Sequence, residues 1–180
     1  LIMIINVARK ELKSLFASPM GWIILALLML AFGSFYLQGV NNYFDVMSGS
    51  IRPAERVGVT IFVGQTVYGI ASFLMLFAVP LLSMGLISGE RKSQTLPFLF
   101  SAPISLAEIV VGKFLGLIIF LSILVAYILL MLSTLNIWAD IDFGYLLSNS
   151  LGLILLAASF SALGIYFSSL TSQPIVAAIL

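Results

Sequence analysis

Few side chains in this 180-residue chain are suited to bond-making chemistry. The sequence contains no histidine and no cysteine, so the usual proton-transfer group near neutral pH, the thiolate nucleophile and the commonest zinc ligands are missing. Gly112 and Lys113 match the end of a phosphate-binding loop, but the preceding glycine and the following serine or threonine of that motif are absent. The sequence therefore predicts a protein that is not an enzyme, with no catalytic residue, no metal site and no cofactor of its own.

Charged, turn-forming and apolar residues mix in one sizeable internal stretch, residues 89–113, with the sequence GERKSQTLPFLFSAPISLAEIVVGK. Thr95 is suited to cap a short helix, and Pro97 fits the first turn, where its missing N–H costs little. The apolar residues of this helix are Leu96, Phe98, Leu99 and Phe100. Such a surface is expected to be covered either by another protein or by the lipid headgroup region.

A break at Ala102 and Pro103 separates this short helix from a second helix start. Ser105 and Glu108 have the spacing of a capping box, in which each side chain satisfies a free backbone N–H at the helix N-terminus. We therefore expect a new helix to begin at Ser105. Long apolar runs flank residues 89–113 on both sides. We therefore expect these residues to form a loop that joins two membrane spans.

The composition is that of an integral membrane protein. Hydrophobic residues make up 62% and charged residues 8% of the chain, whereas soluble domains carry about 25% charged residues. Apolar runs long enough to cross a bilayer occupy residues 20–38, 61–88, 114–135 and 145–168, and residues 174–180 begin a fifth. We therefore predict an all-α integral membrane bundle, a single domain over residues 1–180 that is incomplete at its C-terminus.

Residues 4–18 predict an amphipathic helix that precedes the first span. Its apolar face consists of Ile5, Ala8, Leu12, Leu15 and Phe16. Its polar face consists of Asn6, Arg9, Lys10 and Lys13. Basic amphipathic helices before a span usually lie in the headgroups, so we expect an interfacial helix, and a fully solvated helix is the alternative.

The distribution of charge assigns the two sides of the membrane. One side holds Arg9, Lys10, Lys13, Arg91, Lys92 and Lys113. The outer loops, residues 41–60 and 136–144, hold Arg52 and Arg56 together with Asp45, Glu55, Asp140 and Asp142. The positive-inside rule makes the first side cytoplasmic, together with the N-terminus and the 89–112 loop. The net charge of +1 provides no surface for nucleic acid.

Small and polar residues within the spans predict helix packing. Gly112 and Gly116 permit the close approach of another helix, and Pro80 is expected to kink the second span. Polar groups in the second span need partners in hydrocarbon, so they are expected to face other helices, and contact with substrate along a watery path is the alternative. These residues are Gln65, Thr66, Tyr68 and Ser72. The small residues of the fourth span are Ala157, Ala158, Ser161, Ala162 and Gly164.

None of the four predicted spans contains an ionisable Asp, Glu, Lys or Arg side chain. Ion-coupled carriers usually place such groups or broken helices near the middle of the membrane. A self-powered carrier is therefore disfavoured, and energy for any transport must come from a partner.

Residues 88–116 resemble the cytoplasmic loop of permease subunits of type-2 ABC exporters. In that family a charged cluster leads into Gly-Thr-Leu-Glu and a leucine-rich short helix, then Ser-Ala-Pro and a Glu-Ile-Val-x-Gly-Lys helix start. The N-terminal pattern is similar as well, through Lys10, Glu11, Leu12, Phe16, Ser18 and Pro19. The match covers the N-terminal entry through the third span, and the remainder in topology only. The outer loop and second span also resemble the permeases associated with gliding motility and copper-enzyme maturation.

The resemblance implies the permease subunit of an ATP-driven exporter in a bacterial inner membrane, with six spans in the intact subunit. A cytoplasmic coupling helix would dock on a separate ABC ATPase subunit, which binds ATP and Mg²⁺. Two ATPases and two permeases, either copies or homologues, would form the working unit. The coupling residues implied here are Arg91, Lys92, Thr95, Leu96, Phe98, Leu99, Ala102 and Pro103, while Lys10 and Leu12 would hold the interfacial helix in the leaflet.

Two departures from the family pattern fall in the predicted coupling helix. Gln94 and Pro97 stand where the family commonly has glycine and glutamate, so a charged contact to the ATPase would be missing or moved. The alternative function is a non-transporting membrane anchor or assembly subunit whose loop binds lipid or a scaffold protein. No residue identifies a substrate.

Overall fold

The computed structural model describes residues 2–49, 58–83, 86–87 and 105–170. The helices are α1 (Ile2–Ala17), α2 (Pro19–Met47), α3 (Val59–Ser83), α6 (Leu106–Ser133), the 3₁₀ helix η1 (Thr134–Ile137) and α7 (Phe143–Leu170). No strand occurs within these described ranges. The chain therefore has the all-α architecture that its composition predicts.

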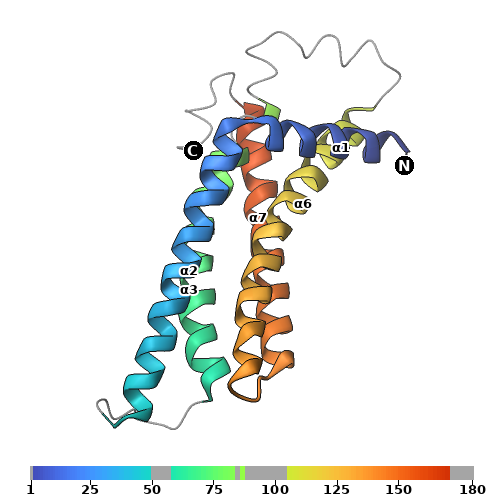
Figure 1. Ribbon diagram of the computed structural model, residues 1–180. Coiled ribbons are helices and arrows are strands. Elements are labelled where there is room, and N and C mark those ends of the chain that lie inside the picture. Colours follow the sequence, from blue (N-terminus) through green and yellow to red (C-terminus); the bar gives the residue numbers. More distant parts are fainter. Residues whose placement is uncertain (1, 50–57, 84–85, 88–104, 171–180) are drawn as a thin grey trace.

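Four of the described helices, α2, α3, α6 and α7, are long and apolar enough to cross a membrane. Figure 1 shows these helices forming an elongated bundle, with α1 lying across one end. Their outer surfaces carry exposed apolar side chains such as Leu30, Phe73, Leu130 and Leu155. A bundle that buries apolar residues inside and exposes them outside is suited to lipid, and α1 lies where a helix on the membrane surface would lie.

Three of these helices lie close to the predicted spans. The helices α3, α6 and α7 cover residues 59–83, 106–133 and 143–170, where the sequence predicts spans over 61–88, 114–135 and 145–168. Pro80 lies inside α3, three residues before its end. The predicted start of a fifth span, residues 174–180, lies outside the described residues.

The first span differs from its prediction at its C-terminal end, which lies away from α1 (Figure 1). The sequence predicts a loop from residue 41, but α2 continues to Met47 and has 29 residues, about 43 Å at the rise of an α-helix. Neither glycine nor proline interrupts residues 41–47, so nothing in the local sequence ends the helix there. It ends at Gly49, whose φ of 80° is a left-handed conformation that glycine adopts without strain. The prediction of a loop over residues 41–47 is therefore wrong.

The corner between α1 and α2 is fixed by backbone geometry and by aromatic contacts. Ser18 is extended, with φ −80° and ψ 127°, and Pro19 occupies the first turn of α2. The indole N–H of Trp22 donates to the carbonyl of Phe16 at 2.7 Å. The Phe16 ring packs edge-on against both Trp22 and Phe120 of α6. These contacts hold the end of α1 against the bundle.

The core of the bundle is largely apolar, and Tyr68 makes polar contacts across it. Fully buried side chains include Phe32, Met75, Leu117, Phe120 and Leu146. The hydroxyl group of Tyr68 in α3 donates to the carbonyl of Leu146 in α7 at 2.9 Å and lies 2.8 Å from Ser150 Oγ. Tyr68 is therefore used for helix packing, one of the two roles open to it from the sequence.

Small residues let α7 approach α3 closely at the end of the bundle that carries α1. Ala157, Ser161 and Gly164 are all buried on one face of α7, as the sequence predicts. A Cβ atom on Gly164 would lie 2.7 Å from Ser83 Cβ, too close for an ordinary contact. Ala162 is exposed, so the packing surface is narrower than the predicted set of small residues.

Candidate functional site

The candidate site consists of the described residues at the two ends of the segment 88–104. Ile87 lies at its entrance and Ser105 at its exit, and neighbouring helices contact the chain near both points. The sequence-predicted coupling residues lie outside the described residues: Arg91, Lys92, Thr95, Leu96, Phe98, Leu99, Ala102 and Pro103. The structure thus describes how the segment is attached to the bundle.

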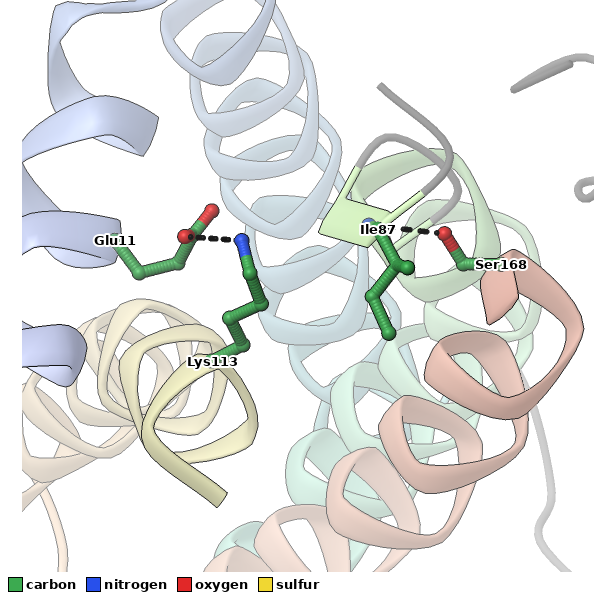
Figure 2. Close-up of polar contacts among 4 residues, drawn as sticks. All are labelled: Glu11, Ile87, Lys113 and Ser168. Atoms are coloured by element: carbon green, nitrogen blue, oxygen red, sulfur yellow. Dashed lines mark hydrogen bonds and ion pairs between the residues drawn. The ribbon is translucent and has the colours of Figure 1, made fainter. Parts of the chain in front are cut away.

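At the entrance, the chain is attached to the end of α7. The backbone N–H of Ile87 donates to Ser168 Oγ at 3.2 Å, and Figure 2 shows this contact between the chain after α3 and the last turn of α7. Leu86 is buried in the core, and Ser83 lies against Gly164, one turn of α7 before Ser168. A displacement of the entrance would therefore act on α3 and α7 together.

At the exit, the predicted capping box is present. The backbone N–H of Glu108 donates to Ser105 Oγ at 3.2 Å, and the backbone N–H of Ser105 donates to Glu108 Oε2 at 3.1 Å. Each side chain thus satisfies an N–H group that the helix leaves free. The cap fixes the point at which the chain leaves the 88–104 segment and enters α6.

The first turns of α6 pack closely against α1, because two glycines leave room for it. A Cβ atom on Gly112 would lie 2.6 Å from Val7 Cβ, and one on Gly116 would lie 2.9 Å from the Ala8 carbonyl oxygen. Neither distance is compatible with a real side chain unless the helices separate. The predicted close approach at Gly112 and Gly116 is therefore confirmed, and its partner is the N-terminal helix.

A buried ion pair lies in the same interface. Lys113 Nζ lies 3.0 Å from Glu11 Oε2, and Figure 2 shows the two side chains pointing toward each other from α6 and α1. Lys113 is 2% exposed and Glu11 is 8% exposed. Charges removed from water in this way need an opposite charge at hydrogen-bonding distance, because an unpaired buried charge is strongly unfavourable.

The sequence does not predict this ion pair. It excludes a phosphate-binding loop at Lys113 and places Glu11 in an N-terminal pattern, but it does not bring the two residues together. The predicted apolar face of α1 is also partly wrong. Val7 and Glu11 are buried, whereas Ile5 is 56% exposed, because α6 packs on a face rotated away from Ile5. One feature of the sequence does point to the pair. Lys113 lies beside the Gly112 packing motif, where a partner helix must come close, and the N-terminal helix contains one acidic residue that could pair with it.

The remaining predicted residues of the N-terminal helix occupy two environments. Lys10 lies on the exposed surface of α1, and Leu12 is partly buried and packs against the core cluster. Arg9 and Lys13 are exposed as well, so the basic residues lie away from the face that contacts α6. This arrangement leaves the basic surface of α1 accessible to headgroups or to water.

Comparison with known proteins identifies the family. The family model described as "ABC-2 family transporter protein" matches residues 5–180, which covers nearly the whole chain, including α1 and all four long helices. No curated protein matches the chain. The matched range includes both ends of the 88–104 segment and the ion pair between α1 and α6. The chain therefore belongs to the ABC-2 transporter family and is a membrane permease of the type-2 ABC class.

Proposed function

We propose that this permease couples ATP hydrolysis by a separate ABC ATPase subunit to export across a bacterial inner membrane. The proposal rests on one observation: the two ends of the 88–104 segment are attached to different helices of the bundle. Ile87 bonds to α7 at the entrance, and the capped start of α6 is joined to α1 beyond the exit. A force applied to the segment would therefore reach four helices, α1, α3, α6 and α7.

The apolar residues of the segment are suited to docking on the ATPase. Leu96, Phe98 and Leu99 would pack into a groove of that subunit, and Arg91 and Lys92 would contact its rim or the lipid headgroups. ATP and Mg²⁺ would be bound by the ATPase, since this chain contains no nucleotide-binding motif. Closure of the ATPases would then move the ends of the segment.

The working unit would contain two ATPase subunits and two permeases, either two copies of this chain or this chain and a homologue. The export path would open between the two permeases when the helices rearrange. The N-terminus and the 88–104 segment would lie in the cytoplasm, which is where the basic residues Arg91 and Lys92 favour it. Membrane lipids would contact the exposed apolar surfaces of α2 and α7.

The proposal is tested by co-purification of the permease with the ABC ATPase on which it would dock. The double substitution Leu96→Asp/Leu99→Asp is expected to release the ATPase and remove its permease-dependent turnover. Two carboxylates without partners in an apolar groove would cost several kcal/mol, which is enough to dissociate an interface of modest affinity.

The matched control is Asn6→Asp/Ser14→Asp, which adds the same charge on the exposed surface of α1 and is expected to leave the ATPase bound. Membrane insertion and thermal stability of all variants are measured in parallel. If the ATPase remains bound to the Leu96→Asp/Leu99→Asp variant with unchanged turnover, or does not bind the natural chain, the anchor function replaces the exporter function.

A further inference from the structure

The helix α1 contacts α6 over several turns. A helix that only rested in the headgroups would need no such contact. Val7 lies over Gly112, Glu11 lies over Gly116, and the ring of Phe16 packs against Phe120. The residue numbers of these contacts increase in the same direction on both helices, so α1 runs alongside the first turns of α6. The contact begins just after the cap at Ser105, where the chain leaves the 88–104 segment.

The charges in this contact select one register. Glu11 is the one acidic residue in α1, and Lys113 is the one basic residue in α6. A shift of α1 by one turn along α6 would move Glu11 away from Lys113 and leave the buried Glu11 carboxylate without this lysine. Well-packed apolar residues would hold two helices together equally well, so the benefit of a buried ion pair lies in fixing their relative position.

We infer that the Glu11–Lys113 ion pair is a positioning element that fixes α1 to the start of α6, so that both helices move as one unit. This inference rests on the proposed function, because it is the ATPase-driven displacement of the 88–104 segment that would move α6. Glu11 and Lys113 would contact neither ATP nor substrate. Their role is to carry a displacement of the cytoplasmic end of α6 into the interfacial helix.

The experiment uses distances between spin labels in the reconstituted permease. Because the chain contains no cysteine, Asn6→Cys, Val110→Cys and Leu170→Cys each introduce one labelling site, on the exposed surfaces of α1, α6 and α7. The pair at positions 6 and 110 measures α1 against α6. The pair at positions 110 and 170 measures α6 against α7.

In the permease alone, the α1–α6 pair is expected to give one narrow distance. The neutral double variant Glu11→Gln/Lys113→Met is expected to lose that single distance and give a broad distribution, while the bundle remains folded. The charge-swapped variant Glu11→Lys/Lys113→Glu is expected to restore the narrow distance. The control Arg9→Gln removes an exposed charge from α1 and is expected to change nothing. A narrow distance in the neutral variant would overturn the inference.

In the complex with the ATPase, trapping the nucleotide is expected to change the α6–α7 distance and to leave the α1–α6 distance unchanged. A change in the α1–α6 distance of the natural chain would also overturn the inference. If the α6–α7 distance does not respond to nucleotide, the proposed function fails, and the distributions measured in the permease alone still decide the role of the ion pair.

Discussion

Replacing Lys113 alone with methionine is expected to destabilise the folded permease by about 3–5 kcal/mol, the usual cost of breaking a buried pair. Glu11 is 8% exposed and would remain between α1 and α6 without its partner at 3.0 Å. The measurement is the unfolding of purified permease in detergent with increasing denaturant. The Lys113→Met variant is expected to unfold at a markedly lower denaturant concentration than the natural chain.

The double variant Glu11→Gln/Lys113→Met provides the matched comparison. It removes both charges and leaves an uncharged amide in place of the carboxylate, so it is expected to be destabilised much less than the Lys113→Met variant. The combined effect of the two single substitutions should therefore greatly exceed the effect of the double substitution. Additive effects of the single substitutions would show that the two side chains do not interact, and would contradict the buried pair.

The second large effect is expected from Gly112→Val. A Cβ atom at this position would lie 2.6 Å from Val7 Cβ and 3.0 Å from the carbonyl oxygen of Ile4, so α1 would have to move away from α6. Overpacking of this kind typically costs about 1–3 kcal/mol, and displacement of α1 would add the loss of the ion pair. The expected result is lower resistance to denaturant and protease cleavage within α1.

Gly152→Val is the matched control for this prediction. It introduces the same β-branched residue into the interior of a helix, but a Cβ atom on Gly152 would meet nothing within 4 Å. Any intrinsic effect of valine in place of glycine is therefore similar in both variants. Equal stability of the Gly112→Val and Gly152→Val variants would show that α1 does not pack against α6 as described.

Much of the architecture is predictable because local patterns determine it. Long apolar runs without charge predict α3 and α7 within a few residues, apart from the end of the second span, which extends into residues that the structure does not describe. They also predict most of α6, whose first turns precede the apolar run. Ser105 and Glu108 form the capping box that their spacing predicts. These features depend on neighbours in the sequence, or on the length of a bilayer, and therefore need no knowledge of the tertiary structure.

The features that the sequence did not predict depend on helix packing between distant segments. The glycine spacing at 112 and 116 predicts a close helix contact but does not identify the partner, which is α1. The ion pair joins residues 102 positions apart, and its existence depends on the rotation of α1 about its axis. The extension of α2 to Met47 was missed because the membrane thickness limits a span, whereas a helix continues until a residue such as Gly49 ends it.

Cysteine crosslinking shows directly whether the 88–104 segment docks on an ATPase. Phe98→Cys introduces a single thiol into a chain that has none, and a short thiol-specific crosslinker would join it to single cysteines placed around the groove of the ATPase. Ser14→Cys, on the exposed surface of α1, is the control on the same side of the membrane. Crosslinking is measured in membranes that contain both proteins.

A permease–ATPase product is expected from Phe98→Cys at defined groove positions, with little product from Ser14→Cys. The product is expected to change with nucleotide, because under the proposed function ATP binding would close the ATPases and move the segment. If Phe98→Cys gives no product with the ATPase and its thiol reacts instead with lipid-soluble reagents, the segment lies in the membrane. That result would contradict the coupling function and favour a membrane anchor.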